Sequence, residues 1–226
     1  MNAALELAKP RAELRLDFGC GQHPKEGFDG VDLYAPDATH KVDLWKFPLP
    51  WEDASVDEIH SSHFVEHLPA REVELRDLRI DYRTNPTLNW ESQKKVREER
   101  EEKARIEFKR FIGQDFFFAF FDECFRILKP GGTMTVVVPA LKTHRAFQDP
   151  THRRFITGET FAYLNAEWRK QQGLDHYRVT CDFAGDVNPI VPQELNLRHP
   201  EAAQRMLWHE WNTMVDLHAL LIKRAE

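Results

Sequence analysis

The sequence predicts an α/β fold in which strands of a mostly parallel sheet alternate with helices. The run TMTVVVP at 133–139 is continuous, apolar and β-branched, as expected of a strand buried on both faces of a parallel sheet. Just before it, FFFAFFDECFRILKPGG at 116–132 has helical spacing and stops at Pro130-Gly131-Gly132, a strong stop and turn signal. A helix that leads straight into a buried strand is typical of α/β proteins.

The remaining elements follow from shorter patterns along the chain. The expected strands are LRLDF (14–18), GVDL (30–33), HKVDL (40–44), VDEIHSS (56–62) and HYRVTCDF (176–183). The segment NTMVDLHALLIKR (212–224) is predicted to be a last strand, with a helix as the alternative. Within 151–168, Thr157 is expected to cap a helix that carries Glu159 in its first turn.

Length and composition limit the class of protein. With 226 residues, 42% of them hydrophobic, the chain fits a single domain over 1–226 with room for an insertion. A net charge of −6 disfavours nucleic acid as the main partner, and no apolar run is long enough to cross a membrane. The three cysteines include no CxxC pair and residues 1–14 lack a secretory signal, which predicts a cytoplasmic protein.

A charged insertion is expected at 69–112. Between 91 and 110, six acidic and eight basic residues are interleaved at spacings that pair opposite charges along a helix. The simpler interpretation is a solvated helical arm. The sharper one is a lid or an arm that contacts a substrate or a partner protein.

The glycine-rich loop after the first strand suggests a nucleoside site. Gly19-Cys20-Gly21 follows Asp17, and glycines allow a close backbone approach to a ligand. A dinucleotide loop needs a third glycine where this chain has Pro24, which favours a nucleoside-type ligand without a phosphate. An ordinary tight turn is the alternative.

Acidic residues at the ends of two further predicted strands strengthen the nucleoside interpretation. Asp32 ends the second strand, where a carboxylate can accept both hydroxyl groups of a ribose. Asp43 ends the third, where it can accept from an adenine amino group. The carboxyl ends of strands in open α/β sheets are where ligands bind.

Taken together, the motifs LDFGCG, GVDL, VDLWKFPLPWEDASVDEIHSSHFVEHL and FFDECFRILKPGGTMTVVVP resemble those of the class I S-adenosylmethionine-dependent methyltransferases, closest to the small-molecule branch. The resemblance covers roughly residues 14–68 and 116–139. It implies a Rossmann-like sheet of seven strands in the order 3-2-1-4-5-7-6, with the last strand antiparallel and helices on both faces.

The resemblance also implies a cofactor, S-adenosyl-L-methionine, and its contacts. Residues of the loop and of three strand ends would hold it: Asp17, Gly19, Cys20 and Gly21 around the methionine part, Asp32 and Leu33 at the ribose, Asp43 and Leu44 at the adenine, and Ser61, Ser62 and His63 at the methionine end. The stretch QHPKEGFDG is too short for a full crossover helix, so the partner of the cofactor carboxylate is not assigned.

The candidate catalytic residues are His152 and His63. His152 lies in DPTHRRF (149–155), after the fifth strand of the resemblance, and can act as a general base near neutral pH; helix entry is the alternative role. His67, in the EHL motif, is assigned a structural role. The eleven histidines form no H-E-x-x-H motif and no metal cluster is evident, so no metal site is predicted.

These observations predict a cytoplasmic methyltransferase that acts on a small-molecule, sugar or nucleotide-type acceptor by in-line displacement. The N-P-P-Y motif of amino-methylating DNA enzymes is absent. One alternative is a catalytically silent cofactor-binding module that binds a protein partner through the charged arm. Another is a nicotinamide oxidoreductase, against which Pro24 argues.

Overall fold

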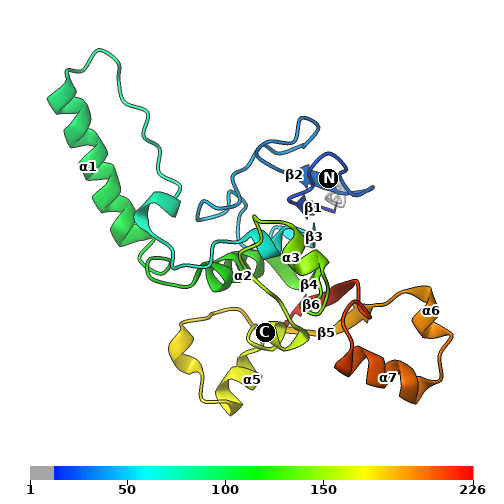
Figure 1. The fold of residues 1–226 in the computed structure, drawn as a ribbon. Helices are drawn as coiled ribbons and strands as arrows, with labels where there is room; N and C mark the ends of the chain where they lie inside the picture. Colours follow the sequence, from blue (N-terminus) through cyan, green and yellow to red (C-terminus); the bar gives the residue numbers. More distant parts are fainter. Residues whose placement is uncertain (1–12, 226) are drawn as a thin grey trace, which may run out of the picture.

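A computed structural model describes residues 13–225, so the expectation about a secretory signal falls almost entirely outside the described residues. One six-stranded sheet runs through this part of the chain in the order β2-β1-β3-β4-β6-β5 (Figure 1). Its strands are β1 (Arg15–Phe18), β2 (Asp29–Val31), β3 (Val56–Ser62), β4 (Leu128–Pro139), β5 (Phe183–Ile190) and β6 (Asp216–Lys223). The first four are parallel to one another, and β6 is antiparallel to β4 and β5.

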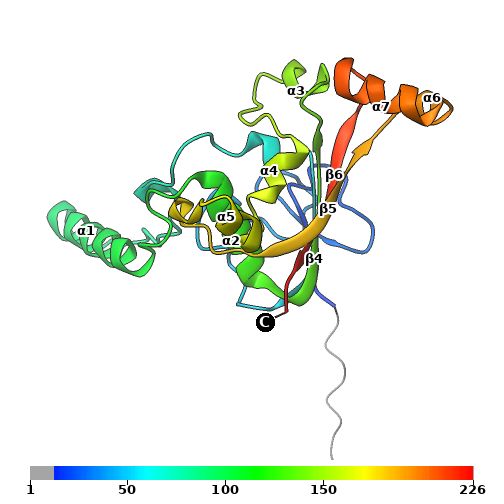
Figure 2. The ribbon, with the colours of Figure 1, turned by 90° about the horizontal axis from the view of Figure 1, so that it is seen from below.

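Seven α-helices and three short 3₁₀ helices connect the strands of the described chain. The α-helices are α1 (Trp90–Glu107), α2 (Phe116–Ile127), α3 (Arg145–Gln148), α4 (Gly158–Ala162), α5 (Ala166–Gln171), α6 (Gln193–Asn196) and α7 (Pro200–His209). The 3₁₀ helices are η1 (Val65–His67), η2 (Leu75–Asp77) and η3 (Asp175–Tyr177). In Figure 2, α2, α4 and α5 lie on one side of the sheet.

The core is built where the aromatic face of α2 packs on the parallel strands. Phe116, Phe120 and Phe121 are fully buried, and the rings of Phe120 and Phe18 of β1 have centroids 6.2 Å apart. Asp115 begins the helix, since its side chain accepts a hydrogen bond from a first-turn N–H group. The α/β prediction is therefore confirmed, and the last strand is antiparallel as expected.

Two predicted strands are not formed. Residues 40–44 make one isolated bridge, between His40 and Val31, because the backbone turns at once around Asp43, whose side chain and carbonyl accept from Trp45 and Lys46 N–H groups. This leaves six strands where seven were expected. The segment 176–183 begins with the end of η3 and is then irregular up to Phe183, where β5 begins.

Buried side chains take the place of a strand ladder in that irregular segment. Asp122 accepts hydrogen bonds from the N–H groups of Thr180 and Cys181, and Arg169 donates to the carbonyls of Val179 and Cys181. The backbone groups are satisfied without a neighbouring strand, so the chain need not be extended there.

Other predicted elements are confirmed with changed limits. Residues 216–223 form β6, a strand and not the alternative helix, and Thr157 stands at the N-terminus of α4. Helix α2 ends at Ile127, ahead of the predicted stop at 130–132, and those residues begin β4. The insertion contains α1, which both views show projecting away from the sheet and in which only Ala104 is buried (Figures 1 and 2).

No helix in residues 13–225 has the length and apolar character needed to cross a membrane.

Candidate functional site

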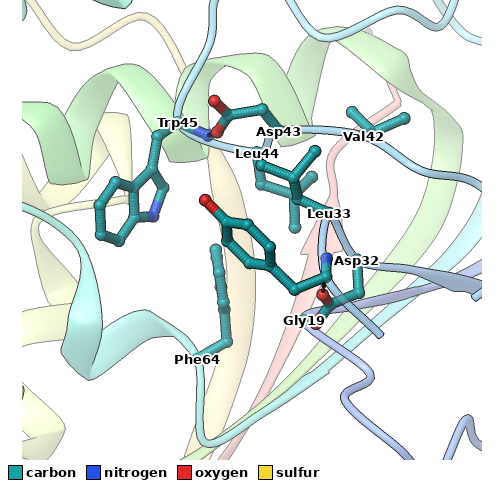
Figure 3. A pocket seen from close by; sticks show the side chains of 9 residues that line it. Gly19, Asp32, Leu33, Val42, Asp43, Leu44, Trp45 and Phe64 are labelled. Atoms are coloured by element: carbon teal, nitrogen blue, oxygen red, sulfur yellow. Dashed lines mark hydrogen bonds between the residues drawn. The ribbon is translucent and has the colours of Figure 1, made fainter. Parts of the chain in front are cut away.

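A cavity of about 220 Å³ opens at the carboxyl ends of β1 and β2 (Figure 3). Gly19 follows β1 directly and Asp32 follows β2 directly, so the sheet itself brings these two residues to one edge. The chain after β2 contributes Leu33, Tyr34, Val42, Asp43, Leu44 and Trp45 to the lining, and Phe64 contributes from the turn after β3. The lining is thus mostly apolar, with two carboxylates.

Both the backbone conformation at position 19 and the contact with Phe64 require a glycine there. Its φ of +68° lies in the left-handed region, and a Cβ atom there would come within 2.5–2.8 Å of the Phe64 side chain. Its N–H group donates to Val31 O on β2 at 2.8 Å. The loop therefore crosses the end of β1 in close contact with Phe64, which lines the same cavity.

The Asp17 carboxylate is buried beneath this loop and holds it in place. One oxygen accepts from the Lys25 N–H at 2.8 Å, and the other lies 2.6 Å from His60 Nδ1. Asp17 is 3% exposed and is not among the residues that line the cavity. Asp17 therefore stabilises the conformation of the loop through these contacts.

The N–H groups of the glycine loop are already hydrogen-bonded to acceptors of the protein. Besides Gly19 and Lys25, Gly21 donates to Asp32 Oδ2 at 3.2 Å and His23 donates to Cys20 O at 3.3 Å. A phosphate site is made from backbone N–H groups that point at the ligand. Four N–H groups of this loop point at protein acceptors instead.

Asp32 and Asp43 supply the two carboxylates of the cavity. Asp32 Oδ1 accepts from the N–H groups of Tyr34 and Ala35, at 2.7 and 2.9 Å, which orients the carboxylate. Asp43 Oδ1 accepts from the Trp45 N–H at 2.9 Å, and within the described chain its second oxygen accepts no hydrogen bond. Both side chains therefore retain acceptor capacity toward a ligand.

Cys20 is held as a neutral thiol. Burial raises the pKa of the Cys20 thiol, and the nearby carboxylates of Asp17 and Asp32 raise it further by opposing the thiolate. Its Sγ atom lies against Gly30, where a Cβ atom would come within 2.9 Å of the sulfur. Cys20 thus packs the loop onto β2 and is not activated as a nucleophile.

A second group of polar side chains surrounds Glu66, in η1 just beyond Phe64. Glu66 is 2% exposed, and no donor within residues 13–225 makes a hydrogen bond to either of its carboxylate oxygens. His63 Nδ1 lies 3.3 Å from Glu66 Oε1, and His152 Nε2 lies 3.9 Å from the same atom. His63 Nε2 also lies 3.8 Å from Asp216 Oδ2 on β6.

The environment of His63 favours its protonated form. The adjoining Glu66 carboxylate raises the pKa of His63 most, burial opposes this, and Asp216 adds a further increase. The residue has a φ of +54°, and its N–H donates to Val137 O on β4 at 2.8 Å. Its position is therefore fixed by the sheet.

Two backbone hydrogen bonds join the EHL motif to the DPTHRRF segment. The carbonyl of Glu66 accepts from the N–H groups of Arg153 and Arg154, at 2.8 and 3.0 Å. The Arg154 guanidinium also donates to Leu68 O, to Pro69 O and to Asp115. Arg154 therefore fastens the two segments together and is engaged with protein groups.

The structure brings together only part of the predicted set. Gly19, Asp32, Leu33, Asp43 and Leu44 line the cavity, whereas Asp17, Cys20, Gly21, Ser61, Ser62 and His63 do not. Both candidate catalytic histidines, His63 and His152, face Glu66.

Sequence reasoning missed the aromatic lining and the central position of Glu66. Tyr34, Trp45 and Phe64 are single aromatics in loops, which carry no periodic signal. Glu66 is part of the quoted EHL motif, but its burial depends on contacts with a segment about 85 residues away, such as that between Arg154 and Leu68.

Comparison of the structure with solved structures identifies the fold. A SAM-dependent methyltransferase from Archaeoglobus fulgidus superposes with a TM-score of 0.51 at 16% identity, over 93% of this chain and 86% of that one. The chain has the fold of the S-adenosylmethionine-dependent methyltransferases.

Within this methyltransferase fold, a SAM-dependent methyltransferase from Methanosarcina mazei also matches, with a TM-score of 0.45, 13% identity and coverage of 95% and 93% of the two chains. No protein-family model matches the sequence, and no curated protein matches it significantly. The assignment is one of fold, and the sequence identity is too low to transfer an activity.

Proposed function

We propose that the protein is an S-adenosylmethionine-dependent methyltransferase that transfers a methyl group to a small-molecule, sugar or nucleotide-type acceptor. One observation carries this proposal. The cavity at the carboxyl ends of β1 and β2 has two carboxylates and apolar walls, next to a glycine loop whose N–H groups are already bound by protein acceptors.

This arrangement favours a nucleoside over a dinucleotide. A pyrophosphate needs free N–H donors or cations, whereas the N–H donors of this loop are already bound to protein acceptors. The carboxylates of Asp17, Asp32 and Asp43 also lie close by, and they would repel a pyrophosphate. A ribose and an adenine amino group are hydrogen-bond donors, which carboxylates accept. The nicotinamide oxidoreductase alternative is therefore disfavoured by electrostatics as well as by Pro24.

The residues present fit the nucleoside part of S-adenosylmethionine. A volume of about 220 Å³ is below the ~300–1,000 Å³ of sites that enclose a drug-sized ligand, so it suits part of the cofactor. In the proposed pose, Asp32 holds the ribose, Asp43 the adenine amino group, and the apolar side chains Leu33, Leu44 and Trp45 the adenine faces. Figure 3 shows Trp45 on one side of the cavity and Leu33 and Leu44 on the other.

Catalysis of methyl transfer depends mainly on the positioning of the acceptor relative to the cofactor. The cofactor supplies an activated methyl group, so the protein must align an acceptor in line with it and keep water out. A general base is needed only for an acceptor that must lose a proton, and His152 and His63 are the proposed candidates. Since Cys20, Cys124 and Cys181 are all free thiols, we propose a reducing compartment, the cytoplasm, as the place of action.

Exposed aromatic rings near His152 support a flat or sugar-like acceptor. The rings of Phe147 and Phe155 stack with centroids 4.6 Å apart, and Trp211 lies 6.0 Å from Phe147. These three side chains are about half exposed. Exposed aromatic rings offer stacking energy to bases and to the apolar faces of sugars.

Calorimetric titration with S-adenosylhomocysteine, the demethylated cofactor, tests the proposal. Wild-type protein is expected to bind it, and Asp32→Ala to bind at least ~10-fold more weakly, because charge-assisted hydrogen bonds are worth about 1.5–3 kcal/mol each. Asp37→Ala, an exposed acid in the same loop, is the control and should bind normally. Absence of binding, or equal binding by Asp32→Ala and wild type, would contradict the proposal, as would tighter binding of NADH.

A second candidate function is a silent cofactor-binding module that binds a protein through α1. The observation that favours it is the exposure of this helix, whose single buried residue is Ala104. Cofactor binding without methylated product across a broad acceptor panel, together with capture of a partner that is lost when α1 is broken, would favour this role over the enzyme.

A further inference from the structure

We propose that Glu66, His67 and His152 bind one divalent transition-metal ion of the zinc or iron class. The three side chains offer ligand atoms that all lie within 4.8 Å of one another. One buried carboxylate with two imidazoles is a donor set typical of Zn²⁺ and non-haem Fe²⁺ sites. Three protein ligands leave at least one coordination position open. An ion on His152 Nε2 takes the lone pair that a general base would use, so with metal bound His63 is the remaining candidate base.

The buried Glu66 carboxylate is the independent observation that points to a ligand. It is 98% buried, and within residues 13–225 neither oxygen accepts a hydrogen bond. His63 Nδ1 and His152 Nε2 approach Oε1 at 3.3 and 3.9 Å, and no ion-pair contact in the described chain reaches Oε2. A buried carboxylate without hydrogen bonds is costly, and natural proteins pair such groups fully or use them for metal coordination.

Both histidines are oriented as metal ligands usually are. His152 Nδ1 is hydrogen-bonded to Ala146 O at 2.9 Å, which requires the proton on Nδ1 and leaves Nε2 as a lone-pair donor 3.9 Å from Glu66 Oε1. His67 Nδ1 lies 3.0 Å from Thr151 Oγ1, and that hydroxyl donates to Asp149 Oδ1 at 2.7 Å. The Thr151 oxygen therefore accepts from His67, whose Nε2 is also left as a lone-pair donor.

The separations require the side chains to close around a bound ion. Zinc lies about 2.0–2.2 Å from nitrogen and oxygen ligands, so two donors of a tetrahedral site are about 3.3–3.6 Å apart. His152 Nε2 and Glu66 Oε1 are 3.9 Å apart and need a small movement. The widest separation, at most 4.8 Å, must close by roughly 1.2–1.5 Å, which requires side-chain rotation.

This site departs from the expectation that the chain has no metal site. Metal-binding sequence motifs place their ligands in one segment, whereas these three ligands come from two segments. The Glu66 carbonyl joins the segments by accepting from the N–H groups of Arg153 and Arg154. Glu66 stands two residues after Phe64, which lines the nucleoside cavity.

The test titrates the chelator-treated full chain with Zn²⁺ alone by calorimetry and with Co²⁺ by visible absorption. One site per chain is expected. Glu66→Gln and His152→Ala should weaken binding by at least ~100-fold, since loss of an outer hydrogen-bond partner already costs 10–100-fold. His209→Ala, an exposed histidine at the end of α7, should bind as wild type.

A second pair of variants guards against misfolding. Thr151 is exposed, so Thr151→Ser and Thr151→Val should both fold. Serine keeps the hydroxyl that orients His67 and should retain affinity, whereas valine should lose about 10-fold or more. No stoichiometric metal binding, or affinity unchanged in His152→Ala and Thr151→Val, would overturn the proposal. Because cofactor is absent from every titration, the result is independent of the proposed methyltransferase function.

Discussion

At the residue scale, the candidate site depends on a few side chains that shape the backbone from beneath. Asp17 and Asp32 each accept hydrogen bonds from loop N–H groups, and Gly19 fits only because it lacks a Cβ atom. Of these three, Asp32 and Gly19 also line the cavity. The same residues therefore set both the loop's shape and the surface that a ligand would meet.

Gly19→Ala should disrupt the site far more than another glycine with a similar backbone. Alanine at Gly19 would meet Phe64 at 2.5–2.8 Å, in addition to the strain of a positive φ. We expect a loss of about 2–4 kcal/mol in unfolding free energy, measured with urea, and a loss of S-adenosylhomocysteine binding. Gly27→Ala, at φ +79° with nothing within 4 Å of the added Cβ, should cost only about 1 kcal/mol. Equal effects of the two substitutions would contradict the steric argument.

The Asp57–Lys129 pair should contribute a pH-dependent stability. Lys129 Nζ donates to Asp57 Oδ1 at 2.6 Å, and this contact is the main reason that the pKa of Asp57 is lowered. A lowered folded-state pKa stabilises the fold above the unfolded value of about 3.9, and the contribution disappears as the pH falls through the folded value. Lys129→Met should lose about 0.5–1 kcal/mol at pH 7, because the pair is partly exposed.

Urea unfolding between pH 7 and pH 3 measures this loss. The difference between Lys129→Met and wild type should begin to shrink below about pH 4, where Asp57 becomes protonated in the unfolded chain, and should vanish as the pH falls through the lower pKa of Asp57 in folded wild type. Lys109→Met, at an exposed lysine, should leave the unfolding free energy unchanged throughout. A loss that stays constant down to pH 3 would show that packing of the Lys129 stem, and not its charge, is responsible.

At the element scale, α1 and α2 have opposite relations to the sheet. Helix α2 buries nine of its twelve residues, and α1 buries one of eighteen. The charged helix therefore draws little stability from tertiary packing, whereas α2 supplies much of the core. We propose α1 as a lid or a partner arm, and the two helices should respond very differently to the same disruption.

Proline substitution separates the two helices. Glu98→Pro, at an exposed position in the middle of α1, costs roughly 3 kcal/mol locally and should reduce helical circular dichroism. The free energy of global unfolding in urea should fall by less than about 1 kcal/mol, since α1 barely packs on the sheet. Ala119→Pro in α2, a fully buried position, should prevent folding. A large loss of global stability in Glu98→Pro would mean that α1 is part of the core.

At the scale of the whole molecule, the sheet edge collects residues from distant parts of the chain. The parallel strands β1, β2 and β3 end at the same edge, so the loop at Gly19, the acid at Asp32 and the turn at Phe64 meet there. The DPTHRRF segment is added by its hydrogen bonds to the EHL motif. Ligand binding at this edge should therefore stabilise the whole fold.

The proposed cofactor should raise the melting temperature by mass action. S-adenosylhomocysteine at 100 times its dissociation constant contributes about 2.7 kcal/mol, which for a chain of this size corresponds to roughly 5–10 °C. Differential scanning calorimetry should show this rise for wild type and for Asp37→Ala, and little of it for Asp32→Ala at the same concentration. A melting temperature independent of the ligand would contradict the proposed function.

The sequence by itself determined the α/β class, most of the strands and five residues of the cavity lining. These features depend on local patterns, such as the continuous run at 133–139 and the acids that follow short strands, and such patterns are visible along the chain. The strands that similar local patterns predicted at 40–44 and 176–183 are not formed. There the side chains of Asp43, Asp122 and Arg169 satisfy the backbone in place of a strand ladder.

Only the tertiary structure decided which polar side chains meet around Glu66. The burial of Glu66, its two oxygens without hydrogen bonds and the facing Nε2 atom of His152 depend on contacts between segments about 85 residues apart. No periodicity or spacing within one segment carries that information. Contact between distant segments is fixed by the packing of the whole sheet, and so the candidate metal site could be found only in three dimensions.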